Sequence, residues 1–537
     1  MSQPFAEIII SSNAVFTGLK NHPEPAAIAI KDNKIMAIVL PEEMKAYSDE
    51  NTKVFEFNDQ LIMAGFHDFH LHIMDGAVSM NSADLLPARS EGEALEIIRR
   101  FAESHPENPW VIGSTWDAGY WDTQQLPNRY SLDRILPDRP ALMFHAEGHY
   151  AWVNSKALEI ANINRDTENP PFGTISKDVN GEPDGLLYEK AMDAVIRYAY
   201  NFSKEQKKAL FTDFLKHAAS LGVTAVHDLF ATESLEMLND YSVFKEFEDK
   251  EELTTRLHFW PALNGDLEHV KQLREKYHSD KLRVSGLKQF IDGVITARTA
   301  YLLEPYADQP DSCGTSTYPP ETIKKWVVDA DKAGFSIRFH AIGDGAIHLA
   351  LDAYEEAEKV NGKRDSRHSV EHIEVIHPKD IHRFKRLGVT ASMQPDHMAM
   401  SERGVYTDRI GPEREKHVFM THSLQESGAN LAFGTDFPID VLSPLLQIYR
   451  AVTRIDSSGN TVWHPHERIT LADALKAYTI GPAYGSFREH ELGILETGKL
   501  ADLVVLERNL FDIPEEEIPD TKVLLTMVDG KVVYHHM

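Results

Sequence analysis

The segment Leu61-Ile62-Met63-Ala64-Gly65-Phe66-His67-Asp68-Phe69-His70-Leu71-His72 is the stretch from which the fold can be worked out. Its apolar start predicts a buried strand, and side chains two positions apart on a strand face the same side. His70 and His72 could therefore hold one metal ion between them. With 26 histidines in the chain, chance alone supplies roughly one His-x-His pair. The pair at His464 and His466 lies in a polar loop and is of that kind, whereas the strand before His70 favours metal ligands.

Composition sets the broad class of the protein. The chain has 537 residues, of which 42% are apolar and 26% charged, and this suits a large globular domain with a second unit. The formal net charge of -28 opposes binding to a phosphate backbone, so we expect no nucleic-acid partner. Cys313 is the single cysteine, which excludes an intrachain disulfide and a cysteine-rich zinc site. Any metal would have to be held by nitrogen and oxygen ligands.

The sequence shows no feature of membrane insertion or export. No apolar run approaches the ~20 residues that cross a bilayer. The first residues, Met1 to Glu7, lack the basic start and apolar run of a signal peptide. We therefore expect a cytoplasmic protein without a membrane partner.

The middle of the chain alternates between short apolar runs and helical patterns. Strands are predicted at residues 223–226, 335–339, 389–393 and 431–433, and helices at 205–221, 320–333 and 346–360. This alternation predicts an α/β fold with parallel strands, and the length of the region suits a (β/α)8 TIM-type barrel.

Both ends of the chain have a different pattern, of short β-strands joined by polar turns. Examples are residues 8–10, 27–30 and 35–39 near the start, and 501–506, 523–525 and 527–534 near the end. Because isolated hairpins are marginally stable, we expect the two ends to pair. The prediction is a small discontinuous β-sandwich domain from residues 1–62 and 484–537. It leaves a barrel at 63–483, with an insertion at about 79–202 over the site.

Further residues that could carry chemistry stand where other predicted strands end. His340 follows the run at 335–339, His372 follows Ser369-Val370-Glu371, and Asp436 follows the run at 431–433. In a barrel the carboxyl ends of the strands meet at one face, where catalysis occurs. One histidine at a strand end is more often a core residue, but four with an aspartate favour a metal centre. These ligands suit zinc, with manganese, iron or nickel as alternatives.

Lys288 lies within an apolar run, where a lysine is costly unless it is paired or neutral. In one interpretation, it is a neutral amine that captures carbon dioxide and becomes an N6-carboxylated lysine that bridges two metal ions. In the other, it is a structural lysine whose head reaches solvent or forms a salt bridge. The sequence favours neither.

Together these residues resemble the amidohydrolase superfamily, most closely the amidohydrolase family 3 branch that contains N-substituted formamide deformylases. The similarity extends over nearly the whole chain. Its motifs are His70-x-His72, Gly148-His149, Lys288 before Asp292-Gly293, His340-Ala341-Ile342-Gly343-Asp344, Glu371-His372, Gln394-Pro395, Gly434-Thr435-Asp436 and Gly498-Lys499-Leu500-Ala501-Asp502-Leu503.

The resemblance implies a barrel with a zinc-type centre of one or two ions. It assigns the metal ligands as His70, His72, Lys288 in carboxylated form, His340, His372 and Asp436. Asp436 would also be the catalytic carboxylate, and His149 would help to stabilise the oxyanion. His67 and Asp68 either orient the centre or belong to the core. The resemblance is also compatible with a homodimer.

The implied activity is hydrolysis of a C–N amide bond in a small molecule, with an N-substituted formamide or related amide as the favoured substrate. A bound cation lowers the pKa of water from about 15.7 towards ~7, and the resulting hydroxide attacks the carbonyl. Asp436 would move the water proton to the departing amine. The same centre could serve a deaminase or cyclic amidase of a heterocycle. A catalytically silent ligand-binding barrel is the alternative from another class, and the complete set of ligands argues against it.

The predicted insertion is rich in aromatic residues. These are Trp110, Trp116, Tyr120, Trp121, Tyr150 and Trp152. Such rings either line an apolar pocket for a substituent of the substrate or form the insertion's own core, and the core is the commoner case.

Overall fold

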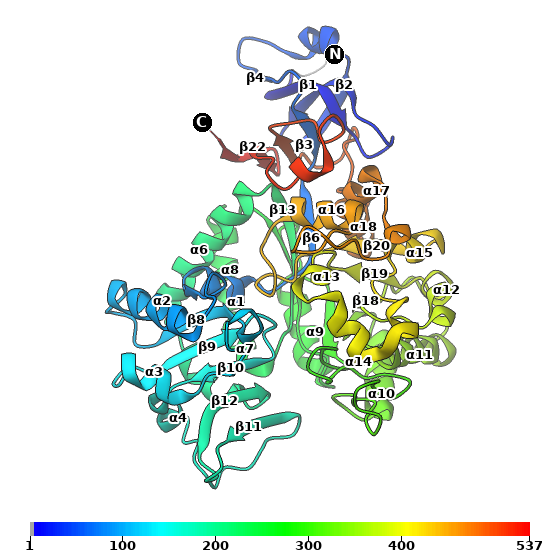
Figure 1. Ribbon diagram of the computed structural model, residues 1–537. Coiled ribbons are helices and arrows are strands. Elements are labelled where there is room, and N and C mark those ends of the chain that lie inside the picture. Colours follow the sequence, from blue (N-terminus) through cyan, green and yellow to red (C-terminus); the bar gives the residue numbers. More distant parts are fainter. Residues whose placement is uncertain (1–4, 537) are drawn as a thin grey trace. The chain divides into compact units, whose positions relative to one another are not determined.

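A computed structural model of the chain describes residues 5–536, apart from the side chains of Glu233 and Ser234 (Figure 1). The chain divides into two compact units. Unit 1 contains the residues up to Leu71, Leu215–Leu229 and those from Phe247 onward, and unit 2 contains His72–Phe214 and Phe230–Glu246. None of the helices within residues 5–536 is long and apolar enough to cross a membrane.

Strands from both ends of the chain form one eight-stranded sheet in unit 1 (Figure 1). The strands are β1 (Ile8–Phe16), β2 (Glu24–Lys31), β3 (Lys34–Val39), β4 (Lys53–Glu56), β5 (Leu61–Ala64), β21 (Leu503–Leu506), β22 (Val523–Val528) and β23 (Lys531–His535). Their order is β23-β22-β21-β5-β1-β2-β3, with β4 also paired to β1. The antiparallel pairing of β5 with β21 joins the two ends of the chain. The domain boundaries at 62 and 484 and the sandwich arrangement stay predictions.

Two parallel sheets carry the rest of the strands in unit 1. The first contains β6 (Phe66–Leu71), β13 (Val223–Leu229), β14 (Arg256–Trp260) and β15 (Leu282–Val284). The second contains β16 (Gly286–Phe290), β17 (Ser336–Ala341), β18 (Ser369–His372), β19 (Thr390–Met393) and β20 (Asn430–Phe433). Only Ser285 separates β15 from β16, and isolated parallel bridges pair Ala262 with Lys288 and Leu71 with Phe437. The predicted α/β fold with parallel strands is confirmed.

The helices of unit 1 alternate with these strands. They are α9 (Leu267–Lys276), α10 (Pro320–Lys332), α11 (Asp344–Asn361), α12 (Pro378–Leu387), α13 (His397–Met400), α14 (Arg403–Glu415), α15 (Thr421–Glu426), α16 (Pro444–Thr453), α17 (Leu471–Ala477) and α18 (Ile480–Gly485). Pro320 and Pro378 begin α10 and α12, where a proline's fixed φ suits the first turn. Every residue of β17 and β18 is buried, as expected for parallel strands covered on both faces.

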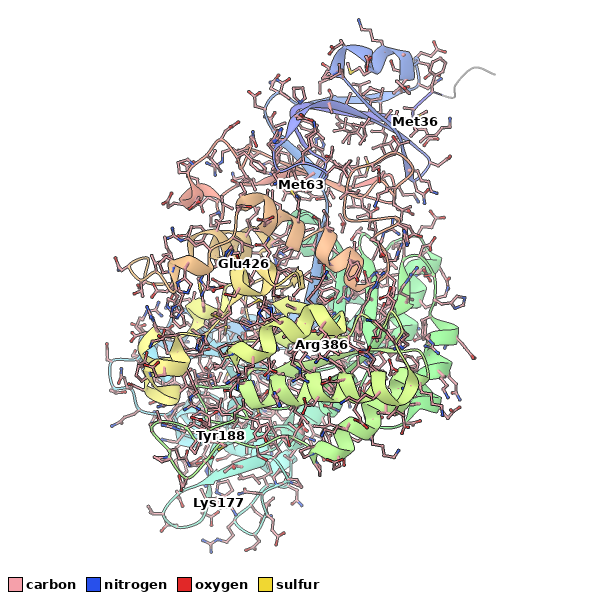
Figure 2. All side chains as sticks on the ribbon, turned by 90° about the vertical axis from the view of Figure 1, so that its right-hand side faces the viewer. Met36, Met63, Lys177, Tyr188, Arg386 and Glu426 are labelled. Atoms are coloured by element: carbon pink, nitrogen blue, oxygen red, sulfur yellow. The ribbon has the colours of Figure 1, made fainter. Side chains whose placement is uncertain are left out.

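Unit 2 is built on a six-stranded sheet of order β11-β12-β10-β9-β8-β7. The strands are β7 (Ala83–Asp84), β8 (Val111–Trp116), β9 (Ala141–His145), β10 (Tyr150–Val153), β11 (Gly173–Lys177) and β12 (Pro183–Glu189). Helices α1 (Ile73–Met80), α2 (Glu91–Ser104), α3 (Arg129–Ile135), α4 (Ser155–Ile160), α5 (Asp193–Ala199) and α7 (Glu233–Glu236) also lie in this unit, and α6 (Lys204–Ser220) and α8 (Tyr241–Asp249) cross its boundary. Lys177 and Tyr188 mark the antiparallel pair β11 and β12 in Figure 2.

The aromatic residues of unit 2 mostly form its core. Trp116, Trp121 and Trp152 are buried in one hydrophobic cluster with residues from the same unit. Tyr120 is exposed. These three tryptophans therefore support the core interpretation of the aromatic-rich segment.

Candidate metal centre

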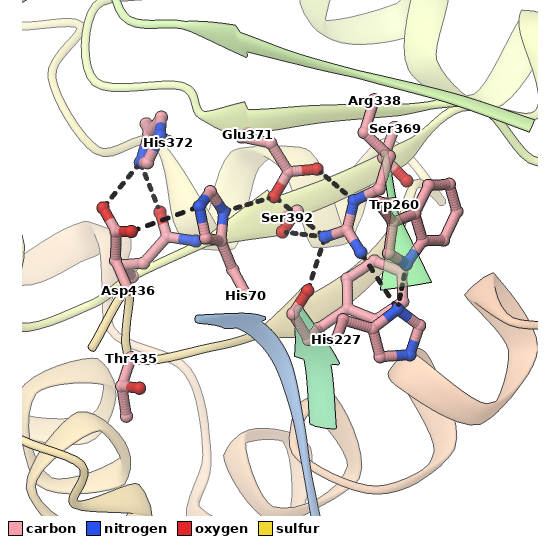
Figure 3. A network of polar contacts seen from close by, with 12 residues as sticks. His70, His227, Trp260, Arg338, Ser369, Glu371, His372, Ser392, Thr435 and Asp436 are labelled. Carbon is pink, nitrogen blue, oxygen red and sulfur yellow. Dashed lines mark hydrogen bonds and ion pairs between the residues drawn. The ribbon is translucent and has the colours of Figure 1, made fainter. Parts of the chain in front are cut away.

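Three strands of unit 1 deliver imidazoles of the predicted centre, and Figure 3 shows two of these side chains, His70 and His372. His70 is the second-last residue of β6, His340 lies near the end of β17, and His372 ends β18. The ring centroid of His372 lies 4.9 Å from that of His70 and 4.5 Å from that of His340. Asp436 follows β20 by three residues, and its carboxylate lies 3.2 Å from His70 Nε2. The structure thus brings together four of the predicted ligands.

The backbone around these residues is fixed in unusual conformations. His372 has φ +73° and Asp436 has φ +59°, in the left-handed region that residues other than glycine rarely adopt. Such strain persists only where surrounding contacts hold it, and it is concentrated at functional sites. The Asp436 N–H donates to the His70 carbonyl at 2.7 Å. At Gly434 a Cβ would lie 2.4 Å from the His70 backbone nitrogen, so only glycine fits there.

Asp68 links the segment that carries His70 to the segment that carries Asp436. Its carboxylate accepts hydrogen bonds from the His70 backbone N–H at 3.1 Å and from the Thr435 hydroxyl at 2.8 Å. Burial raises the pKa of Asp68 to about 7, although these hydrogen bonds lower it in part. The contacts assign Asp68 to orienting the segments that carry His70 and Asp436.

The position of the proton on His70 follows from its partners. Nδ1 lies 2.8 Å from Glu371 Oε2, and Glu371 forms a two-pronged ion pair with Arg338. Burial raises the pKa of Glu371, but Arg338 and His70 outweigh it and lower that pKa to about 2. Glu371 is therefore ionised and can only accept, so the His70 proton lies on Nδ1. Burial also lowers the pKa of His70, so its Nε2 carries a lone pair that faces the Asp436 carboxylate.

The other two imidazoles are also oriented by hydrogen bonds. His372 Nδ1 donates a hydrogen bond to the Gln394 carboxamide oxygen at 2.9 Å. His372 Nε2 is buried and has no hydrogen-bond partner among residues 5–536. Burial lowers the pKa of His372 well below its ordinary value, so this nitrogen carries a lone pair. His340 Nε2 donates to the Gly293 carbonyl at 3.2 Å, which fixes the orientation of its ring.

Lys288 occupies the middle of β16 and is fully buried. Its Nζ has no hydrogen-bond partner in the described part of the chain, and it lies 4.7 Å from the centre of the Phe290 ring. Burial lowers the pKa of Lys288 to about 8, although the carboxylates of Glu371 and Asp436 oppose the shift. The interpretation of Lys288 as a lysine whose head reaches solvent is therefore wrong.

His397 belongs to the site but has no place among the residues predicted from the sequence. It begins α13, and its ring stacks on His372 at 5.5 Å between centroids. Its Nε2 lies 3.6 Å from Asp436 Oδ2. Burial lowers the pKa of His397, but the carboxylates of Glu374 and Asp436 outweigh it and raise that pKa. The available signal was the motif Gln394-Pro395, which ends two residues before His397.

Two predicted site residues belong to unit 2. His72 stands at the N-cap position of α1, where unit 2 begins. His149 pairs through Nδ1 with Glu189 Oε2 at 3.0 Å, within the same unit. The roles predicted for His72 and His149 stay predictions.

The donor set fits a divalent transition metal. Ligand atoms of His70, His372 and Asp436 lie within 4.8 Å of one another, and all three residues are buried. His70 Nε2 faces a carboxylate oxygen, and the buried His372 Nε2 has no hydrogen-bond partner in the described part of the chain. A cation held between these ligand atoms would satisfy the buried nitrogens and the buried carboxylate together. Imidazole and carboxylate are the ligands that zinc and its neighbours in the first transition row prefer.

Comparisons with known proteins agree with this chemistry. The model of the amidohydrolase family matches residues 53–534. Protein LONG AFTER FAR-RED 3 of Arabidopsis thaliana is 32% identical, over 98% of this chain and 92% of its own length. N-substituted formamide deformylase of Arthrobacter pascens is 28% identical, over 99% of both chains.

A solved structure extends the similarity to three dimensions. The crystal structure of an uncharacterized metal-dependent hydrolase from Pyrococcus furiosus matches with a TM-score of 0.73 and 26% identity, over 93% of this chain and 99% of that one. The match of the family model over most of the chain confirms the predicted family. The chain belongs to the amidohydrolase family, as a hydrolytic enzyme that acts on carbon–nitrogen bonds other than peptide bonds.

Proposed function

We propose that this amidohydrolase holds one or two divalent metal ions, zinc in the first instance. The proposed ligands are His70, His72, Lys288 in carboxylated form, His340, His372 and Asp436. The single observation that carries the proposal is the 3.2 Å approach of His70 Nε2 to Asp436 Oδ1. With the His70 proton on Nδ1, both atoms offer electron pairs, and a metal cation satisfies both. Manganese, iron and nickel suit the same ligands and are the alternatives to zinc.

Carboxylation of Lys288 is the second part of the proposal. The neutral amine nitrogen bonds to the carbon of carbon dioxide and releases one proton, which gives a carbamate with two oxygen ligands. The reaction needs an unprotonated amine, and a pKa of about 8 provides a fraction of it near neutral pH. The buried Nζ, which has no hydrogen-bond partner among residues 5–536, supports this role.

The proposed reaction is hydrolysis of a small N-substituted formamide or related amide to an acid and an amine. A metal ion, when bound, supplies Lewis acidity and lowers the pKa of water. Asp436 accepts the proton of the attacking water at a carboxylate oxygen and delivers it to the departing amine nitrogen. His149, oriented by Glu189, is proposed to stabilise the oxyanion. The substrate class rests on the 28% identity to the formamide deformylase.

We propose in addition that the parallel strands close into an eight-stranded barrel. Strands β15 and β16 then count as one strand interrupted at Ser285. The bridges of Ala262 with Lys288 and of Leu71 with Phe437 support closure, because each links one parallel sheet to the other. In such a barrel, residues at the carboxyl ends of the strands form the active face.

The test combines metal analysis with a substrate screen on the purified full-length protein. We expect about one or two equivalents of a transition metal, and hydrolysis of arylalkyl formamides to formate and amine. Turnover of aminated heterocycles or cyclic amides in place of formamides would reassign the substrate to the deaminase or cyclic amidase class. Absence of metal, together with no hydrolysis after addition of zinc or manganese, would overturn the proposal in favour of a silent ligand-binding barrel.

A further inference from the structure

A second group of buried histidines lies in unit 1, on neighbouring strands of the first parallel sheet. It consists of His67 on β6, His227 on β13 and His258 on β14, and we name it the histidine cluster. Their ligand nitrogens lie within 4.8 Å of one another, as a metal site requires. The rings of His227 and His258 stack in parallel at 4.5 Å between centroids. Distance alone would make this cluster a further metal site.

The hydrogen bonds of His227 give a different assignment. Its Nδ1 lies 2.8 Å from the Trp260 indole nitrogen and 3.1 Å from Arg338 Nη1, as Figure 3 shows. Indole and guanidinium groups can only donate, so Nδ1 accepts both hydrogen bonds and carries no proton. A neutral His227 then holds its proton on Nε2, which donates to His67 Nε2 at 2.8 Å. A proton occupies the space between these two nitrogens, where a metal would need two lone pairs.

Arg338 connects this cluster with the proposed metal centre. It is fully buried on β17, two residues before His340, so the two side chains face the same side of the strand. Nε donates to Glu371 Oε1 at 2.7 Å and Nη2 to Glu371 Oε2 at 2.9 Å, while Nη1 donates to His227. Nη2 also lies 2.6 Å from the Phe69 carbonyl oxygen and 3.2 Å from the Ser392 hydroxyl. Each of its three nitrogens therefore has a fixed acceptor.

Glu371 connects Arg338 to His70. Its Oε2 accepts from Arg338 and also from His70 Nδ1, at 2.8 Å. Asp436 stands on the opposite side of the same imidazole, 3.2 Å from Nε2, and competes with Glu371 for the single proton of neutral His70. If that proton moved to Nε2, it would form a hydrogen bond with Asp436 and remove the lone pair needed by a cation.

We propose that Arg338 and Glu371 are positioning residues that hold His70 in its Nδ1–H form, so that Nε2 is ready to bind metal. The inference rests on the proposed metal centre and explains why His70 Nε2 can bind a metal ion there. Arg338 fixes the carboxylate of Glu371 from one side, and His227 fixes Arg338 from the other. Partners of this kind typically change metal affinity by about 10- to 100-fold when they are replaced.

The variant Glu371→Gln tests the inference, because a carboxamide has one acceptor where Glu371 uses two. In place of either oxygen, the NH2 group meets an N–H of Arg338 from which it cannot accept, so the carboxamide loses the geometry that holds the His70 proton on Nδ1. We expect the dissociation constant for zinc, measured by competition with a chromophoric chelator, to rise by about 10- to 100-fold. We also expect the visible absorption spectrum of the cobalt-loaded protein to change, which a loss of stability alone would not cause. Ser392→Ala is the matched control, since it removes one contact of Arg338 and leaves Glu371 in place.

The outcomes separate this inference from the proposed function. If the wild-type protein binds no transition metal, the proposed metal centre fails and the inference fails with it. If the wild-type protein binds metal tightly but Glu371→Gln has the same affinity and cobalt spectrum, only the inference is overturned. If the variant does not fold, neutron diffraction from the deuterated, metal-free wild-type protein decides. It should show deuterium on His70 Nδ1 and on His227 Nε2, and deuterium on His70 Nε2 in place of Nδ1 would contradict the inference.

Discussion

Two groups of buried side chains in unit 1 satisfy the same distance criterion for a metal site, and their hydrogen bonds distinguish them. The carboxylate cluster consists of His70, His372 and Asp436, and the histidine cluster consists of His67, His227 and His258. In the carboxylate cluster, obligate acceptors take the protons on the outer nitrogens, so lone pairs point inward. In the histidine cluster, obligate donors approach His227 from outside and force a proton inward. Proximity of ligands is therefore insufficient, and the partners on the far side of each ring decide what it can bind.

The histidine cluster contains no carboxylate like that of Asp436. Because Asp436 is also the proposed proton acceptor, we expect its replacement to have the largest effect on activity. In Asp436→Asn the side chain keeps an oxygen ligand but cannot accept a proton. We expect kcat to fall by roughly 10²- to 10⁴-fold, as for loss of a general base, with metal content largely retained. Steady-state kinetics on the best substrate, with metal analysis of the same preparation, checks both. Full activity in this variant would remove Asp436 from the proposed proton transfer.

A matched pair of substitutions tests the comparison itself. In His372→Gln the unmatched lone pair is lost, and we expect zinc affinity to fall by about 100-fold or more, at the upper end of effects seen for residues around metals. In His258→Gln we expect unchanged metal content and a loss of stability of about 1–3 kcal/mol, because the substitution removes the hydrogen bond of His258 Nδ1 with the Ser285 hydroxyl. Metal titration and urea denaturation of both variants give the answer. Metal loss in His258→Gln would mean that the histidine cluster binds a cation.

Much of the parallel fold could be predicted from local patterns. The helix predicted at 320–333 is observed as α10 at Pro320–Lys332, and the predicted strand at 389–393 contains β19 at Thr390–Met393. The helix has a strong apolar periodicity, and a strand buried on both faces is a continuous apolar run, so both elements can be recognised from the local sequence. The insertion predicted at about 79–202 stays a prediction, because the compactness of a segment depends on contacts that a local pattern does not encode.

Among the described site residues, the predictable ones were those at strand ends. His70, His340 and His372 were found because carboxyl ends of parallel strands converge. Arg338 was not found, because an arginine inside a strand has no local signal that distinguishes a core residue from an exposed one. The contact between His70 and Glu371 joins residues 301 positions apart. Which nitrogen carries the proton depends on such contacts, so the sequence could predict the ligands but not their protonation.

Lys288 lies beside the carboxylate cluster, and its pKa gives a prediction about stability. The ordinary pKa of 10.5 falls to about 8 in the folded protein, so the unfolded chain binds more protons between these values. The cost of burying the charged amine is fully present below pH 8, amounts to about 3 kcal/mol, and disappears as the pH rises towards 10.5.

The variant Lys288→Met should therefore be more stable than the wild-type protein at pH 7, by about 3 kcal/mol, when metal and bicarbonate are absent. The difference should shrink above pH 8, which urea denaturation at several pH values will measure. Lys325→Met, at an exposed position paired with Asp329, is the control and should show no such trend. With bicarbonate and zinc present, only the wild-type protein should gain stability. A difference that is equal at pH 7 and pH 10 would contradict the assignment of Lys288 as a buried, uncarboxylated amine in the metal-free protein.

Trp260→Phe should have the smallest effect and tests how separate the two clusters are. Phenylalanine keeps an aromatic ring beside Arg338 but removes the indole N–H that donates to His227. Loss of one buried hydrogen bond costs about 1 kcal/mol of stability. Because Arg338 still donates to His227 Nδ1, the proton of His227 stays on Nε2 and the contact of Arg338 with Glu371 is unchanged. Zinc affinity should therefore stay within about twofold of the wild-type value, far below the ~10-fold minimum for a partner of a metal ligand. A tenfold loss of affinity in Trp260→Phe would show that the metal centre depends on the histidine cluster directly, and not only through Arg338.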